Sequence, residues 1–258
     1  LTDPATVVST GRSPGEADRT RPLTPASPGG SDRRGRCYLS PMVPLDIISD
    51  PVCPWCLIGK ARLDAAIEQT GRNPFTPRWR MFRLNPDMPA EGMDRQAYLE
   101  QKFGGPERAA EVYAQVAEAA RGAGLDLALD RIDRAPQTQD AHRLIRWAAA
   151  EGVQTPAAEQ LLRRYFERGQ DISERTVLLD TAESVGLDRA VVDRLLDGED
   201  AVAELEAEEA EARRMGVQGV PCFVVAGRHV IEGAQETATW ARIIEEVEAV
   251  LAEEEPGA

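Results

Sequence analysis

The chain has 258 residues, 42% of them hydrophobic, which allows one or two domains with a sizeable core. Its formal net charge of -14 at pH 7 argues against nucleic acid or an anionic membrane surface as a partner, because both attract clustered lysine and arginine. No apolar run approaches the roughly 18 residues that a membrane span needs, so we expect a soluble protein.

The first 41 residues carry six of the 18 prolines and six arginines without apolar periodicity, a composition typical of a disordered extension. They also lack the apolar segment of a secretory signal. The chain begins with Leu1, whereas Met42 stands just before the first predicted strand. We therefore expect Met42 to be the natural start, residues 1–41 to be a tail or an over-extended reading frame, and Cys37 to be an exposed thiol without a role.

The first regular elements flank two cysteines in the motif CPWC. Residues 45–49 form a short β-branched run, and apolar residues fall at mostly helical spacing from 55 to about 71. Cys53 is therefore expected at the N-terminus of a helix, where free N–H groups and the helix dipole stabilise a thiolate. Cys56 lies one turn further on the same face and can attack a mixed disulfide formed at Cys53. Pro54 suits the first helical turn.

A CxxC pair also occurs as one half of a zinc site, so the remaining ligands decide between metal and redox chemistry. The only other cysteines are Cys37 and Cys222, and the only histidines are His142 and His229, without a second metal-ligand spacing. This shortage favours a redox pair and no metal. Four cysteines, of which two share a motif, are also unlike a secreted disulfide framework, so we expect a reducing cytoplasm.

The middle of the chain is predicted to be helical. Residues 75–84 form a second strand, which completes a βαβ unit with a parallel strand pair. From about residue 94 to 215 no convincing strand occurs, and helices are expected at 98–103, 109–122, 138–150, 155–169, 173–186, 191–198 and 199–215. Thr155 and Ser173 are predicted to cap two of them. The acidic residues of the last helix are expected to form a solvated face: Glu204, Glu206, Glu208, Glu209 and Glu211.

Strand character returns near the C-terminus. Residues 217–226 and 229–232 are predicted to form a hairpin, and 237–251 a closing amphipathic helix. An isolated hairpin would be marginal, so these strands are expected to join the first two in one sheet. The sequence thus predicts an α/β core in two parts, residues 42–90 and 216–258, with residues 91–215 as an inserted helical domain.

Three blocks of sequence together resemble a known family. They are SDPVCPWCLIGK at 49–60, TQDAHRL at 138–144, and GVQGVP at 216–221 with Phe223 and Val224, followed by GAQ at 233–235. The combination resembles the DsbA-like branch of the thioredoxin superfamily. It looks most like the FrnE-type cytoplasmic oxidoreductases, which are similar to 2-hydroxychromene-2-carboxylate isomerases and kappa-class glutathione transferases. The resemblance covers about residues 42–254 and implies a thioredoxin-like core split by an inserted all-helical domain.

The resemblance also implies a substrate groove. It implies that the Val220–Pro221 bond is cis and that this loop lies against the cysteines, where the Val220 backbone can pair with an extended substrate. Without it, Val-Pro reads as an ordinary trans turn. The expected substrate-binding residues are Pro54, Trp55, His142, Val220 and Pro221. For His142 a structural role remains an equal alternative.

Cys222 departs from the family pattern, in which a bulky apolar residue is usual. It is either a small buried hydrophobe or a third thiol near the pair, and strand alternation favours the first because it points residues 221 and 222 to opposite faces. His229 stands next to a turn and is expected to be exposed.

The leading hypothesis is a cytoplasmic thiol-disulfide oxidoreductase, a protein disulfide reductase or isomerase, with Cys53 as nucleophile and Cys56 as resolving thiol. Its substrates would be disulfide-containing proteins or small thiols, with no bound cofactor and glutathione as a candidate reductant or co-substrate. Trp55 offers no charge to stabilise the thiolate, so no extreme oxidant is expected. The alternatives are a glutathione-dependent isomerase or transferase on a small aromatic or polyketide-like substrate, which Cys56 argues against, and a non-catalytic binding module or chaperone.

Overall fold

The computed structural model describes residues 42–254. The predictions for residues 1–41, including the exposed thiol at Cys37, lie outside the described residues. No helix within the described part has the length and apolar character that crossing a bilayer requires.

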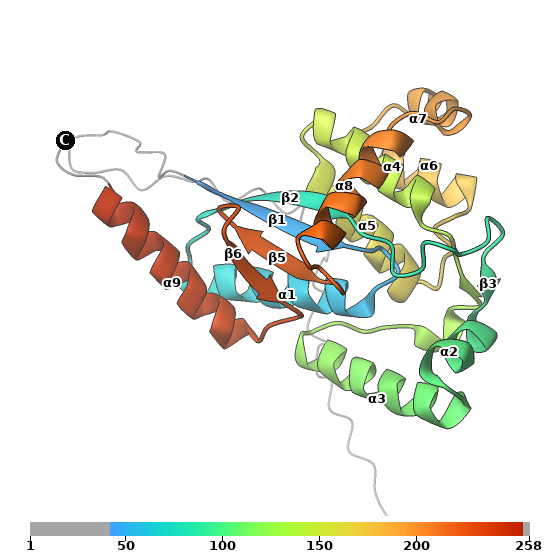
Figure 1. The fold of residues 1–258 in the computed structure, drawn as a ribbon, viewed down its shortest axis with the longest axis horizontal. Helices are drawn as coiled ribbons and strands as arrows, with labels where there is room; N and C mark the ends of the chain where they lie inside the picture. The colour runs from blue at the N-terminus through green and yellow to red at the C-terminus, as the bar shows by residue number, and fades with distance from the viewer. Residues whose placement is uncertain (1–41, 255–258) are drawn as a thin grey trace, which may run out of the picture. The chain divides into compact units, whose positions relative to one another are not determined.

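A mixed sheet of four strands lies at the centre of the fold (Figure 1). Strand β1 (Val43–Ser49) pairs in parallel with β2 (Phe75–Met81) and antiparallel with β5 (Cys222–Val225), which in turn pairs antiparallel with β6 (His229–Glu232). Helix α1 (Pro54–Thr70) connects β1 to β2. The predicted βαβ unit and the union of both ends of the sequence in one sheet are therefore confirmed.

Helix α9 (Thr237–Glu254) closes the core by packing against α1 and the sheet. Its Trp240 is fully buried and makes edge contacts with Phe223 and Phe75, with ring centroids 4.8 and 6.4 Å apart. Edge-to-face geometry is the arrangement that aromatic rings favour. These contacts join α9 to strands from both halves of the core.

The segment between β2 and β5 is helical apart from one short ladder. Its helices are α2 (Arg95–Phe103), α3 (Pro106–Gly122), α4 (Gln139–Ala150), α5 (Gln154–Phe166), α6 (Arg175–Ser184), α7 (Arg189–Leu196) and α8 (Val202–Arg214), with a 3-10 turn at Leu129–Arg131. The prediction of an insertion without strands missed β3 (Met93–Asp94) and β4 (Arg134–Ala135), which pair antiparallel. Two residues are too few to leave an alternating pattern in a sequence.

The start of α5 differs from its prediction because its polar side chains bind β2. The helix begins at Gln154, and the Thr155 hydroxyl accepts a hydrogen bond from Trp79 Nε1 at 3.0 Å instead of capping the helix. The Gln154 amide accepts from the Trp79 N–H at 3.0 Å and donates to the Trp79 C=O at 3.1 Å. Ser173 likewise is no cap, because its N–H and hydroxyl donate to Asp171.

One carboxylate of α8 contradicts the predicted solvated face. Glu209 is 4% exposed and accepts hydrogen bonds from Arg83 Nε at 2.8 Å, the Arg83 N–H at 3.0 Å and Arg213 at 2.7 Å. Burial acts to raise the pKa of Glu209, but the hydrogen bonds from Arg213 and Arg83 outweigh it and lower that pKa. Glu204, Glu206 and Glu211 are exposed as expected. Residues 42–254 contain no group of three or more His, Cys, Asp or Glu that could hold a metal ion.

Two hydrophobic clusters occupy the described part. The larger contains Cys53 and Cys56 together with residues of α1, α4, α5 and α9. The smaller lies under α8 and consists of Ile48, Phe82, Ala212, Val217 and Cys222. Cys222 is 1% exposed, so the prediction of a small buried hydrophobe, separate from the cysteine pair, is confirmed.

Candidate active site

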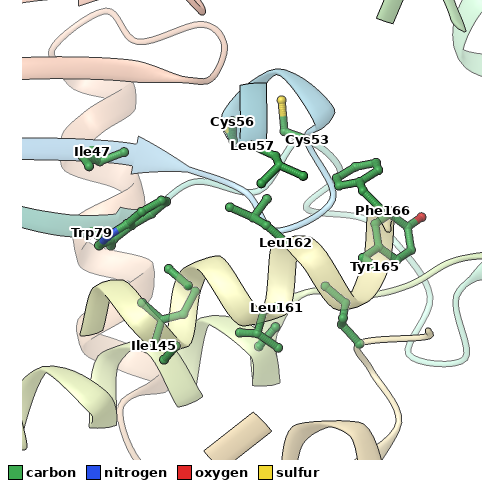
Figure 2. Packing of buried hydrophobic residues seen from close by; sticks show 14 of the residues in the cluster. Ile47, Cys53, Cys56, Leu57, Trp79, Ile145, Leu161, Leu162, Tyr165 and Phe166 are labelled. Carbon is green, nitrogen blue, oxygen red and sulfur yellow. The ribbon is translucent and has the colours of Figure 1, made fainter. Parts of the chain in front are cut away.

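Cys53 occupies the position immediately before α1. Its backbone is extended, Pro54 takes the first helical position, and the thiol donates to the Val220 carbonyl over 3.3 Å. Figure 2 shows the sulfur directed away from Leu57 and Leu162, which pack beneath it. The thiol is therefore placed at the N-terminus of a helix, as predicted.

Cys56 lies in the first turn of the same helix, and its N–H bonds to the Cys53 carbonyl at 3.1 Å. The two thiols are within hydrogen-bonding reach. Burial first, and then the neighbouring Cys53, raise the pKa of Cys56 well above 9, while the Ser49 hydroxyl and the Asp50 N–H act in the opposite direction. Cys56 is therefore protonated at neutral pH.

The loop before β5 lies directly against the cysteine helix. The Val220–Pro221 peptide bond is cis, which agrees with what the sequence resemblance implied. A Cβ on Gly59 would lie only 3.2 Å from Pro221 Cγ and 3.3 Å from Ala234 Cα. The glycine after the CxxC motif therefore allows α1 to approach this loop.

His142 lies beneath the active-site loop and is 4% exposed. It belongs to the first turns of α4, and its Nε2 is 3.7 Å from Oδ1 of Asp50. Asp50 is also buried, and its carboxylate accepts from the Leu84 N–H at 2.8 Å and from the Val52 N–H at 3.4 Å. The two hydrogen bonds that the Asp50 carboxylate accepts hold the loop between β1 and α1 in place. The His142 imidazole thus approaches the active-site loop from the protein interior.

The structure brings most of the predicted site residues together. Cys53, Cys56 and Val220 are linked by the contacts above, and Pro221 packs at Gly59. Pro54 and Trp55 are half-buried between the two cysteines. The second histidine, His229, is exposed at the start of β6, as expected.

The model of the DsbA-like thioredoxin domain matches residues 44–245. This chain belongs to that family. A probable DsbA oxidoreductase from Streptomyces coelicolor has 27% identity and a TM-score of 0.73, over 80% of this chain and 90% of that one. The uncharacterised protein YwbO of Bacillus subtilis is 24% identical over 74% of this chain and 90% of its own length.

Two further structures share the fold at lower identity. The cytosolic disulfide reductase DsbM of Pseudomonas aeruginosa, solved with glutathione, has 22% identity and a TM-score of 0.54, over 82% of this chain and 98% of that one. A 2-hydroxychromene-2-carboxylate isomerase has 15% identity and a TM-score of 0.60, over 82% and 97%. The DsbA-like fold thus supports a thiol oxidoreductase or a related isomerase or transferase.

Sequence reasoning missed a buried cation behind the cysteines of this DsbA-like domain. Lys60 is 7% exposed and forms ion pairs with Asp64 at 2.6 Å and with Glu159 of α5. Burial acts to lower the pKa of Lys60, but Glu159 and Asp64 outweigh it and raise that pKa. The signal was available, since residue 60 follows Cys56 by one turn and therefore falls on the buried face.

A second missed group lies on the insertion side of Cys53. Arg95 is 6% exposed, stacks on the rings of Tyr113 and Tyr165 at 5.2 and 5.4 Å, and donates to both hydroxyls. Burial raises the pKa of Tyr113, and the neighbouring Arg95 acts in the opposite direction. Nothing in the local sequence marked these three residues, because they come from three different helices.

Proposed function

We propose that this DsbA-like domain is a thiol-disulfide oxidoreductase that reduces or isomerises disulfide bonds. The observation that carries the proposal is the position of the Cys53 thiol, which lies at a helix N-terminus, 3.3 Å from the Val220 carbonyl and within hydrogen-bonding reach of Cys56. A disulfide arriving at Cys53 meets a nucleophile, a second thiol and an irregular backbone segment in one place.

The proposed reaction has two exchange steps. The Cys53 thiolate attacks one sulfur of a substrate disulfide, forms a mixed disulfide and releases the other sulfur as a thiolate, which takes up a proton. Cys56 then attacks Cys53, forms the internal disulfide and releases the second substrate sulfur as a thiol. The substrate gains two electrons and two protons, and a thiol reductant such as glutathione returns them to the protein.

The same loop supplies the proposed substrate groove. The Val220 backbone pairs with an extended segment of the substrate, Pro221 shapes the groove, and Pro54 and Trp55 contact the substrate beside the cysteines. Disulfide-containing proteins and small disulfides both suit an attack at Cys53. The net charge of -14 supports a protein without nucleic acid or membrane partners.

We place the reaction in the cytoplasm. The four cysteines do not form the kind of disulfide framework that small secreted proteins have. A protein of the same fold, DsbM of Pseudomonas aeruginosa, is a cytosolic disulfide reductase. In such a reducing compartment the net direction is reduction or isomerisation, because the glutathione pool keeps the pair reduced.

The test is a redox titration of the full chain in glutathione buffers, with the free thiols of Cys53 and Cys56 counted by maleimide mass shift. A two-electron transition that disappears in Cys56→Ser supports the dithiol mechanism, and its midpoint shows the preferred direction. Cys222→Ser serves as the control and leaves the transition in place. A pair that never forms a disulfide contradicts the proposal.

A glutathione-dependent isomerase or transferase is the second candidate, favoured by the fold shared with the 2-hydroxychromene-2-carboxylate isomerase. In the same titration it would show Cys53 glutathionylated with Cys56 unreacted, and full activity in Cys56→Ser. A binding module or chaperone would instead assist refolding of a client protein when both cysteines are replaced by serine.

A further inference from the structure

One polar atom beneath the active site lacks a partner. His142 Nε2 is buried and forms no hydrogen bond among residues 42–254, since Asp50 Oδ1 at 3.7 Å is beyond hydrogen-bonding distance. Buried polar atoms are almost always paired with protein groups or with ordered water. An unpaired nitrogen on a titratable ring, close to a reactive cysteine pair, therefore calls for an explanation.

A small cavity lies between His142 and the end of β1. Ser49 and His142 are among the residues that line it. Its volume is about 10 Å³, counted as the space that the centre of a water molecule can occupy. This is about the room that one water molecule needs, and the hydroxyl and the imidazole are groups that can hold it. The cavity is thus bordered both by His142, which carries the unpaired nitrogen, and by Ser49.

Ser49 also contacts the resolving thiol. Its hydroxyl acts to lower the pKa of Cys56, a thiol that is 2% exposed, so the two side chains are neighbours. The pKa of Cys56 is raised by burial, so this thiol carries a proton that must leave when its sulfur attacks Cys53. The thiol is buried, and Ser49 offers its proton a path toward the cavity.

We propose that His142 accepts the proton of Cys56, passed through the Ser49 hydroxyl and one water molecule in this cavity, during the second exchange step; this rests on the proposed oxidoreductase function. The Cys56–Cys53 bond forms, and the bond between Cys53 and the substrate sulfur breaks. The substrate leaves as a thiolate and takes a proton from solvent. When the disulfide is reduced again, His142 returns its proton to Cys56.

The charges around His142 come from three elements. Asp50, in the connection between β1 and α1, places a carboxylate oxygen 3.7 Å from His142 Nε2, whereas Arg80 of β2 and Arg146 of α4 line the cavity. The cavity-lining residues on α5 and α8 carry no charge; they are Ala158, Leu162 and Leu205. Asp50 is thus the carboxylate that stabilises the imidazolium formed in the proposed step.

The two exchange steps can be timed separately with dithiodipyridine, which releases one coloured thione when Cys53 attacks and a second when Cys56 resolves. The full chain with Cys37 and Cys222 replaced by serine is the reference. We expect His142→Gln to slow the second release at least tenfold and to leave the first unchanged, as for loss of a proton acceptor.

Three further variants complete the test. Ser49→Ala and Asp50→Asn should also slow only the second release, and His229→Gln, at the exposed histidine, should change neither. The proposal is overturned if His142→Gln keeps the second rate, or slows both releases alike. A reference protein that gives the first release without the second contradicts the oxidoreductase function itself.

Discussion

Cys53 and Cys222 are both buried cysteines, at 3% and 1% exposure, yet their surroundings differ in every other respect. Cys53 lies at a helix N-terminus, bonds to a loop carbonyl and has Cys56 one turn away. Cys222 lies in a strand among apolar side chains under α8, with no second sulfur in its cluster. Burial is therefore common to both thiols, and the helix start and the neighbouring thiol are the features that set Cys53 apart.

The largest expected effect separates these two cysteines directly. Cys53→Ser should reduce the rate of disulfide reduction to the rate without protein, because the nucleophile is lost. Cys222→Ser should keep the wild-type rate. An insulin-disulfide reduction assay with both variants checks this, and a loss of activity in Cys222→Ser would show that the third thiol takes part.

The contact between α1 and the cis-proline loop supplies the next effect. Gly59→Ala should lower the catalytic efficiency by about tenfold, because the added methyl displaces the loop at Pro221 and Ala234 from the cysteines. Overpacking of this kind also costs roughly 1–3 kcal/mol of stability. Steady-state kinetics and chemical denaturation measure the two effects.

Gly122 provides the matched control, since an added Cβ at this helical glycine would meet nothing within 4 Å. Gly122→Ala should keep the activity and gain up to about 1 kcal/mol from helix propensity. If both glycine variants behave alike, the close approach at Gly59 has no bearing on the site.

The pH dependence of alkylation tests whether burial raises the pKa of Cys56 and of Cys222 alike. Burial raises the pKa of Cys56 and of Cys222, so each has less thiolate at neutral pH than an ordinary cysteine. Alkylation of Cys56 in the Cys53→Ser protein, and of Cys222, should be slow at neutral pH and increase with pH beyond pH 9. Timed iodoacetamide labelling followed by peptide mass spectrometry checks this. Rapid labelling of Cys222 at neutral pH would contradict a raised pKa for this thiol.

The smallest expected effect concerns α8, which covers Cys222. Glu209→Gln should lower the free energy of unfolding by about 1–2 kcal/mol at neutral pH, because charged hydrogen bonds to Arg83 and Arg213 are weakened. The pKa of Glu209 is lowered in the folded state, so its contribution exists above the ordinary carboxyl pKa and is lost as the pH falls through the lowered value. The difference from wild type should therefore vanish in acid.

Glu206, exposed on the same helix, is the control for this denaturation experiment. Glu206→Gln should leave the stability unchanged at both pH values. Equal losses in the two variants would indicate a general effect of charge on α8 instead of the bonds at Glu209.

The sequence was sufficient for features that depend on neighbouring residues. Alternation and helical spacing predicted the βαβ unit, and the CxxC motif predicted the place of Cys53 and Cys56. The partners of His142 and Arg95, and Glu159 as a partner of Lys60, could not be predicted in this way, because each depends on how α2, α4 or α5 docks on another element. Glu209 was wrongly predicted to be solvated for the same reason. One of the two arginines that bind it, Arg83, follows β2 and meets α8 only in the folded protein.

The pairing of Gln154 with Trp79 has a consequence for self-association. Strand β2 forms one edge of the sheet, and an uncovered edge is a template on which another chain can add a strand. The Gln154 side chain occupies both the N–H and the C=O of Trp79, as a neighbouring strand would. The insertion thus protects the core against edge-to-edge aggregation as well as supplying residues beneath the cysteines.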